Sequence, residues 1–178
     1  MRWVLIRHGK TQGNLEHRYI GCRTDEPLCP EGAAQLQGRK MPPVSRVYAS
    51  PMRRCMETAA LLYPGVPVEI VEDFRECDFG AFENRNYQEL NGRADYQAWI
   101  DSNGELPFPG GESRVDFSRR CVRAFEKIRN QMDDCAVITH GGTLMAIMEA
   151  QTSGSYYDFQ VENGGGFVLE EDGAFHRI

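Results

Sequence analysis

Short apolar runs alternate with longer stretches of helical periodicity along most of the chain. Two late runs, at residues 167–170 and 175–178, flank Asp172 and Gly173 and predict a closing hairpin. Four earlier apolar runs predict buried strands, at residues 3–7, 46–49, 66–71 and 135–139. Helices are expected at residues 11–18, 30–40, 51–62, 94–101 and 113–132, and again after residue 140.

Cap residues set the expected start of the third helix. Ser50 is a good N-cap and Pro51 a good first helical residue, so this helix is expected to begin at Pro51. The segment from residue 73 to residue 111 carries no clear period. It is expected to be irregular apart from the short helix at residues 94–101.

The alternation of strands and helices predicts an α/β fold. We expect a three-layer α/β/α sandwich with a mostly parallel central sheet, because parallel neighbours are joined by helical crossovers. A chain of 178 residues without repeats or low-complexity tracts is expected to form one domain over residues 1–178. Ligands of open α/β sheets bind beyond the carboxyl ends of the strands, so residues that follow the apolar runs are the candidates for a site.

Two histidines follow apolar runs in the same local pattern. His8 and Gly9 come after the first run, and His140 and Gly141 come after the fourth. Glycine lets the backbone approach a ligand closely and leaves amide groups free to bind an anion. One histidine at a strand end is more often structural than catalytic, but two in equivalent positions indicate one shared site.

Charge narrows the partners that such a site could have. The net charge of −6 argues against nucleic acid, whose binding needs a clustered basic surface. Arg7, Arg53 and Arg54 nevertheless lie near strand ends. They either form a cationic pocket for a small anion or act only as solubilising charge.

The chain shows no signal for secretion or for a membrane. Its first apolar run, Trp3 to Ile6, is too short for a signal sequence core or a membrane span. The six cysteines contain no C-x-x-C pair and lie mainly in apolar stretches, which favours reduced thiols. We therefore expect a cytoplasmic protein with no membrane partner and no disulfide framework.

The residues around both histidines belong to a longer series of motifs. In chain order the series reads RHGKTQGN from residue 7, TDEPLCPEGAAQ from residue 24, ASPMRRCMETA from residue 49, FRECDFGAFE from residue 74, PGGES from residue 109 and ITHGG from residue 138. It resembles the signature of the histidine phosphatase superfamily, the phosphoglycerate mutase-like proteins. Six matches in the same order make coincidence a poor explanation.

The resemblance implies a role for each matching residue. His8 is expected to be the nucleophile that forms a transient phosphohistidine, and Glu76 the proton donor to the leaving group. Arg7 and Arg54 are expected to bind the phosphoryl group, and His140 to stabilise it. Further substrate contacts are expected from Asn14, Thr24 and the amide of Gly141.

Physical chemistry supports these roles. A neutral imidazole is nucleophilic, and nearby arginine charges discourage protonation of His8. Arginine presents a planar fork that matches phosphate oxygens. Register with the motif favours Arg54 over Arg53 for this contact, although Cys55 stands where the family has alanine. Glu76 can remain a proton donor if apolar neighbours bury it and raise its pKa.

Three other phosphate chemistries lack their residues in this sequence. Gly9, Lys10 and Thr11 resemble the end of a P-loop, but that loop needs glycine where Val4 stands. No cysteine has the arginine six positions later that a C-x5-R phosphatase uses. The four histidines, at positions 8, 17, 140 and 176, form no close His–Asp pattern for a binuclear metal site, so no metal or cofactor is implied.

Within the family, the alternatives are hydrolysis and mutase-type phosphoryl transfer. The segment between Glu76 and His140 is shorter than in the mutases, which favours a phosphomonoester hydrolase acting on a small phosphorylated metabolite. The PGGES segment in a short chain resembles α-ribazole phosphatases, which makes α-ribazole phosphate a candidate substrate. A phosphate-binding module without turnover is the third alternative.

Substrate selection is expected to depend on residues 84–111, which lie between the motifs. Four aromatic residues in this segment either stack on a nucleoside-like leaving group or pack as core and lid, and they are Tyr87, Tyr96, Trp99 and Phe108. The sequence leaves both alternatives open.

Overall fold

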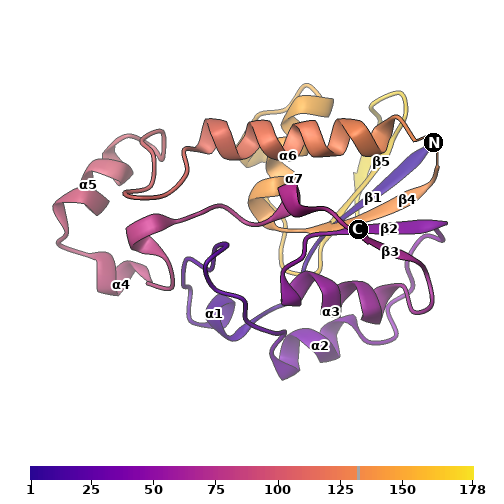
Figure 1. The fold of residues 1–178 in the computed structure, drawn as a ribbon, viewed down its shortest axis with the longest axis horizontal. Coiled ribbons are helices and arrows are strands. Elements are labelled where there is room, and N and C mark those ends of the chain that lie inside the picture. Colours follow the sequence, from indigo (N-terminus) through magenta and orange to yellow (C-terminus); the bar gives the residue numbers. More distant parts are fainter. Residues whose placement is uncertain (132) are drawn as a thin grey trace.

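The computed structural model describes residues 1–131 and 133–178, and within them the strands form a six-stranded sheet (Figure 1). The strand order is β3-β2-β4-β1-β5-β6. The first four strands are mutually parallel, and the last two add an antiparallel hairpin at one edge. The strands are β1 (Arg2–Arg7), β2 (Arg46–Ala49), β3 (Val68–Ile70), β4 (Cys135–Thr139), β5 (Gly166–Glu170) and β6 (Phe175–Arg177). The predicted mostly parallel sheet and closing hairpin are confirmed.

Helices connect the strands. In chain order the α-helices are α1 (Gln12–Leu15), α2 (Pro30–Leu36), α3 (Arg53–Leu62), α4 (Tyr87–Leu90), α5 (Ala94–Asp101), α6 (Arg114–Arg129) and α7 (Gly141–Gln151). Short 3-10 helices lie at η1 (Glu72–Phe74), η2 (Gly80–Phe82) and η3 (Tyr156–Phe159). None of the helices in the described part of the chain has the length and apolar character needed to cross a bilayer.

The helices cover both faces of the sheet. Successive side chains of a strand point to opposite faces, so Trp3 and Leu5 of β1 pack toward α6 and α7. Val4 and Ile6 pack on the other face, toward α2 and α3. Figure 1 shows α6 and α7 on one side of the strands and α2 and α3 on the other. The predicted three-layer α/β/α sandwich is therefore confirmed.

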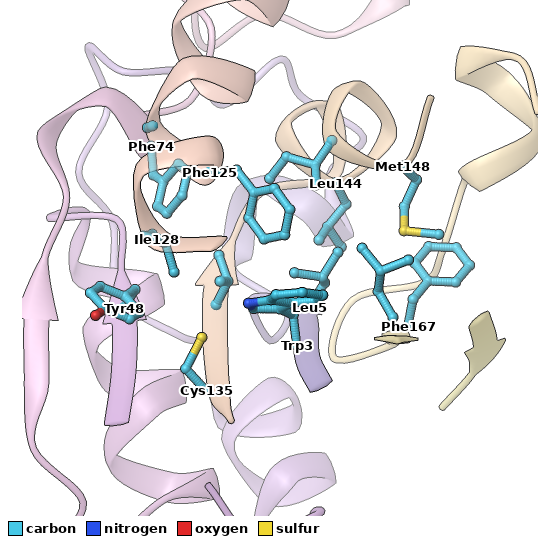
Figure 2. Packing of buried hydrophobic residues seen from close by; sticks show 14 of the residues in the cluster. Trp3, Leu5, Tyr48, Phe74, Phe125, Ile128, Cys135, Leu144, Met148 and Phe167 are labelled. Atoms are coloured by element: carbon cyan, nitrogen blue, oxygen red, sulfur yellow. The ribbon is translucent and has the colours of Figure 1, made fainter. Parts of the chain in front are cut away.

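The core on the α6–α7 face holds the central strands in place. Trp3 meets Phe125 of α6 edge to face, with ring centroids 6.1 Å apart. Leu144 and Met148 of α7 close the same cluster beside Phe167 of β5 (Figure 2). Burying a side chain of this size contributes about 1.5–3 kcal/mol. This packing fixes the carboxyl ends of β1 and β4, after which the two motif histidines stand.

Helix α3 begins later than the sequence predicted. Its N-cap is Met52 and its first residue Arg53, so the prediction of a Ser50 cap with Pro51 as first helical residue is wrong. The Ser50 hydroxyl lies 2.9 Å from Nε2 of His140 and 3.4 Å from the Met52 amide. The Ser50 hydroxyl therefore contacts His140, which follows β4, and Ser50 does not cap α3.

Other elements are shorter than predicted. Helix α1 ends at Leu15, and His17 shortly beyond it takes a positive φ of 53° that a helix cannot accommodate. Helix α2 ends at Leu36 because Gln37 adopts an extended backbone. Strand β3 spans only three exposed residues at the sheet edge. Helix α6 ends at Arg129, and Met132, the end predicted from the sequence, lies outside the described residues.

The segment from residue 73 to residue 111 is more ordered than its sequence indicated. It contains η1, η2 and α4 in addition to α5, whose bounds match the predicted 94–101. Aromatic side chains of this segment form a separate cluster with Tyr19, which we call the aromatic cluster and which comprises Tyr19, Phe79, Phe82, Tyr96, Trp99 and Phe108. Figure 1 shows α4 and α5 projecting away from the sheet layers.

Candidate active site

The two motif histidines lie against each other at the carboxyl ends of the central strands β1 and β4. Parallel pairing sets Arg7 of β1 opposite Thr139 of β4, so His8 and His140 follow at equivalent positions. Their ring centroids are 5.2 Å apart with the planes at 67°. His8 is 4% exposed and His140 is fully buried. The structure thus brings together the two residues that the strand pattern placed at one site.

The turn after β1 orients the His8 ring. Nδ1 lies 2.7 Å from the carbonyl oxygen of Gly9. A carbonyl only accepts hydrogen bonds, so Nδ1 carries the proton and Nε2 keeps a free lone pair. Burial, then the charges of Arg54 and Arg7, hold the pKa of His8 well below its usual value. The ring is therefore a neutral imidazole with Nε2 available as a nucleophile.

Arg54 is a buried cation in the first turn of α3. Its guanidinium donates to the carbonyl of Thr24 at 3.0 Å and to that of Gly21 at 3.3 Å. The Thr58 hydroxyl donates to the Arg54 carbonyl at 2.7 Å and accepts from the Gly9 amide at 3.0 Å, which ties α3 to the His8 turn. Arg54 is thus held rigidly beside the histidine.

Arg53 points away from the site. It is exposed and lies 2.9 Å from Glu57, one turn further along α3. The geometry therefore agrees with the motif register that favoured Arg54 over Arg53.

Arg7 approaches the site from the end of β1. It donates to the carbonyl of Val161 at 2.8 Å, and burial lowers the pKa of its guanidinium. A Cβ atom built on Gly141 would lie 3.3 Å from Nε of Arg7. Glycine at this position lets the N-terminus of α7 lie directly beside the arginine.

Glu76 lies against His140 in a protected position. Its Oε2 is 3.8 Å from Nδ1 of His140, and its Oε1 accepts from the amide of Cys77 at 2.9 Å. Burial is the main reason that the pKa of Glu76 is raised and that the pKa of His140 lies well below its usual value. The His140 ring is therefore neutral, and burial shifts the Glu76 carboxyl toward its protonated form.

Asn14 and Thr24, which were expected to contact the substrate, form hydrogen bonds within the protein. Oδ1 of Asn14 accepts from the amide of Thr11 at 3.1 Å and from Nδ2 of Asn163, also at 3.1 Å. Thr24 contacts the site through its backbone carbonyl, which holds Arg54. Both residues support the groups around the histidine in this structure.

Asn163 is a site residue that the motif analysis missed. Besides Asn14, its Nδ2 contacts the His8 carbonyl at 3.2 Å. The following Gly164 donates its amide to the same carbonyl at 3.0 Å. A polar residue followed by three glycines and then an apolar run stands at residues 163–167, and this pattern was the available signal.

Donors without partners converge on this site. Among the described residues, Nε of Arg7 and Nε of Arg54 are both buried and make no hydrogen bond. Buried donors are nearly always satisfied, so both guanidinium groups keep donor capacity that the protein itself does not use. A tetrahedral oxyanion such as phosphate supplies acceptors in several directions.

A cavity of about 620 Å³ leads to this cluster. Its wall includes Arg7, Glu76 and Gly141, with the exposed residues Gln160 and Glu162 at the rim. His8 and His140 are buried and do not line this cavity themselves. Among the described residues, no group of three or more His, Cys, Asp or Glu side chains is arranged to hold a metal.

The cysteine nearest to the histidines is not activated. Sγ of Cys55 lies 3.6 Å from Nε2 of His140. Burial raises the pKa of the Cys55 thiol to about 12, so it is a neutral packing group. All six cysteines of the chain are free.

Comparison with known proteins agrees with this geometry. The adenosylcobalamin/α-ribazole phosphatase of Salmonella typhimurium is 30% identical over 179 residues, which cover 92% of this chain and 87% of that protein. The 2,3-bisphosphoglycerate-dependent phosphoglycerate mutase 2 of Gloeobacter violaceus is 32% identical over 161 residues, 82% of this chain and 73% of the mutase.

A solved structure of a phosphatase has a similar fold. The α-ribazole phosphatase from Shigella flexneri superposes with a TM-score of 0.83 at 26% identity, over 97% of this chain and 92% of that one. Residues 3–174 match the family model of the histidine phosphatase superfamily (branch 1). The predicted family and the predicted phosphatase class of enzyme are confirmed, and this chain belongs to the histidine phosphatase superfamily.

Proposed function

We propose that this protein hydrolyses small phosphomonoesters through a phosphohistidine formed at Nε2 of His8. One observation carries the proposal. A neutral histidine with a free Nε2 lies beside two buried arginines, Arg7 and Arg54, whose Nε donors have no partner among the described residues. This arrangement offers a nucleophile and a phosphate clamp at the same point.

The first half of the reaction transfers the phosphoryl group to the enzyme. Nε2 of His8 attacks phosphorus, and the bond to the ester oxygen breaks. The carboxyl proton of Glu76 passes to that oxygen, so the alcohol leaves neutral. The Gly9 carbonyl accepts from Nδ1 throughout and stabilises the positive charge that develops on the ring.

The second half returns the enzyme to its starting state. The Glu76 carboxylate takes a proton from water while the water oxygen attacks phosphorus, and the bond to Nε2 breaks. Inorganic phosphate leaves, His8 is neutral again and Glu76 is protonated again. Arg7, Arg54 and His140 stabilise the charge on the equatorial oxygens in both halves.

Hydrolysis fits the site better than mutase-type transfer does. A mutase must retain its released intermediate until the phosphoryl group returns, which requires a cavity closed to water. Here Gln160, Glu162 and Arg177 on the cavity wall are exposed to solvent. The segment between Glu76 and His140 is also short. Water can therefore reach the phosphoenzyme.

The substrate is a small metabolite phosphate, and α-ribazole 5′-phosphate is the candidate that we favour. It is supported by the likeness to phosphatases that bear its name. We also infer that turnover needs no metal ion, since Arg7 and Arg54 supply the positive charge. A cytoplasmic location is supported by the six free cysteines.

The test is release of phosphate from an aryl phosphate in excess EDTA. Wild type is compared with His8→Ala and with His176→Ala, a matched control that removes an exposed histidine of β6. The His8→Ala variant is expected to lose at least about 10⁴-fold in kcat, and the control to retain wild-type activity. Turnover that survives in His8→Ala, or that needs added metal, would overturn the proposal.

The same assay ranks the candidate substrates. α-Ribazole 5′-phosphate is expected to exceed 3-phosphoglycerate in kcat/KM. The reverse order, with a second phosphate transferred instead of released, would favour the mutase alternative.

A further inference from the structure

A second cavity opens from the active site into the aromatic cluster. Its volume of about 200 Å³ corresponds to roughly seven water molecules at about 30 Å³ each. Phe79, Trp99 and Phe108 form one wall, and Tyr156 and Tyr157 of η3 form part of the other. The two walls come from segments far apart in the sequence.

Three residues connect this cavity to the phosphate cavity. Glu76, Gly142 and Met145 line both of them. A monoester with its phosphoryl group beside Arg7 and its ester oxygen at the Glu76 carboxyl therefore has its alcohol portion directed at the aromatic walls. The position of the proton donor fixes this order along the substrate.

The walls provide an apolar environment with little free charge. Apart from Glu76, Arg114 is the one arginine, lysine or carboxylate residue among the described residues that line the cavity. Its guanidinium carbon lies 5.4 Å above the centre of the Tyr156 ring and its Nη2 is 3.7 Å from Glu105. Its charge is thus partly engaged within the protein, and the rest of the described cavity wall is uncharged apart from Glu76.

The aromatic rings are held in fixed orientations before any ligand arrives. The ring centroid of Phe108 lies 4.9 Å from that of Phe79, in an edge-to-face contact, and 5.1 Å from that of Trp99. Tyr96 stacks on Trp99 with the planes at 12°, and it is not one of the cavity residues. Preorganised rings bind a flat partner without a large ordering cost.

Tyr157 is the exposed member of the opposite wall. It is 54% exposed. Its ring packs edge to face on Tyr156, with the ring centroids 5.1 Å apart. A Cβ built on Gly104 would lie 3.5 Å from the Tyr157 hydroxyl and 3.3 Å from the Trp99 ring. The two walls therefore approach each other at Gly104, with Tyr157 at the solvent side.

We propose that this cavity binds a planar, uncharged aromatic ring system carried by the leaving alcohol, and that Tyr157 is a specificity-determining residue for it. The inference rests on the proposed hydrolysis at His8 and adds the place where the ring of the leaving group binds and a residue that selects it. It also divides the four aromatic residues named from the sequence between the two alternatives left open there. Trp99 and Phe108 line the cavity, whereas Tyr96 lies behind Trp99 and Tyr87 does not line it.

The experiment compares two substrates with the same primary alcohol. α-Ribazole 5′-phosphate carries a planar base, and ribose 5-phosphate carries none. Wild type is expected to prefer the base-containing substrate by about tenfold or more in kcat/KM, the scale of one stacked ring. Tyr157→Ala is expected to lower this preference about three- to tenfold, because kcat/KM for α-ribazole 5′-phosphate falls more than kcat/KM for ribose 5-phosphate.

The matched control is Tyr87→Ala. Tyr87 is 61% exposed and does not line the cavity, so its removal is expected to leave the preference unchanged. Equal turnover of both substrates by wild type would overturn the inference. So would a Tyr157→Ala variant that loses both activities to the same extent.

A binding measurement separates this inference from the proposed hydrolysis. α-Ribazole without phosphate is titrated into His8→Ala protein while the fluorescence of Trp99 is followed. Saturable binding that weakens in the His8→Ala, Tyr157→Ala double variant supports the cavity even if no phosphate is ever released. Absence of binding overturns the inference, whatever the outcome of the hydrolysis assay.

Discussion

The ends of β1 and β4 carry the same sequence pattern but differ in their hydrogen-bond partners. At the end of β1, the Gly9 carbonyl accepts from His8 and leaves Nε2 free. At the end of β4, Nε2 of His140 is engaged by the Ser50 hydroxyl at 2.9 Å, and Nδ1 faces Glu76. One ring thus keeps a reactive lone pair, whereas the other is held between two side chains.

The difference shows that a strand-end histidine acquires its role from its neighbours. Both rings are buried, and both have a pKa well below the usual value because of burial first and Arg54 second. Protonation state alone therefore does not distinguish them. The free nitrogen makes His8 suited to attack, and the fixed geometry makes His140 suited to stabilise charge.

The largest expected effect that sharpens this comparison comes from removing each histidine in turn. His140→Ala is expected to lower kcat about 10²–10³-fold, the typical loss of one preorganised charge-stabilising donor. That loss is smaller than the one expected for His8→Ala. Rapid-quench experiments should still detect a phosphoenzyme in His140→Ala and none in His8→Ala. Phosphoenzyme in neither variant, with equal losses of kcat, would break the comparison.

A second, smaller effect concerns pH and the acid that faces His140. In the proposed mechanism, activity needs neutral His8, whose lowered pKa moves the acid limb below that of an ordinary histidine. It also needs protonated Glu76, so with an alkyl phosphate kcat is expected to fall as the pH rises through the raised pKa of this carboxyl. Glu76→Gln is expected to abolish this alkaline limb and to lower kcat about 10²–10⁴-fold.

The substrate provides the control for this prediction. An aryl phosphate has a good leaving group and needs little protonation, so Glu76→Gln should reduce its turnover far less. Equal losses on alkyl and aryl phosphates would remove Glu76 from the acid role.

The smallest expected effect comes from removing the Ser50 hydroxyl, which contacts Nε2 of His140. Ser50→Ala removes the hydroxyl that holds the ring, and we expect a loss of a few-fold in kcat together with about 1 kcal/mol of unfolding free energy. Ser45→Ala is the matched control, since its hydroxyl bonds the exposed Asp134 carbonyl far from the histidines. Urea denaturation and steady-state kinetics measure the two losses. An unchanged kcat in Ser50→Ala would show that the ring is fixed by packing alone.

Much of this architecture was predictable from local patterns. The bounds of β2, β4 and α5 agree with the apolar runs and the helical period. The converging histidines were also predictable, because parallel strands place their carboxyl ends at the same edge of a sheet. The element bounds depend on residues close together in the chain, and the histidine pair follows from one local pattern that occurs twice.

The rest depends on contacts between distant segments. Ser50 has the sequence features of a helix cap, but its hydroxyl contacts His140, which follows another strand. Asn163 reaches the His8 carbonyl only because β5 pairs with β1. Tyr157 joins the aromatic walls through η3, which no period in the sequence indicated. Long-range pairing decides these roles, and a single sequence does not display it.

Arg54 shows how activity and stability oppose each other within one side chain. The side chain is fully buried, and its partners are the neutral carbonyls of Thr24, Gly21 and, at 3.5 Å, Ile20. Burying a charge without a counter-charge costs several kcal/mol. A bound phosphate supplies that counter-charge, so ligand occupancy and resistance to unfolding are thermodynamically linked here. Phosphate binding is therefore expected to raise the free energy of unfolding of this protein.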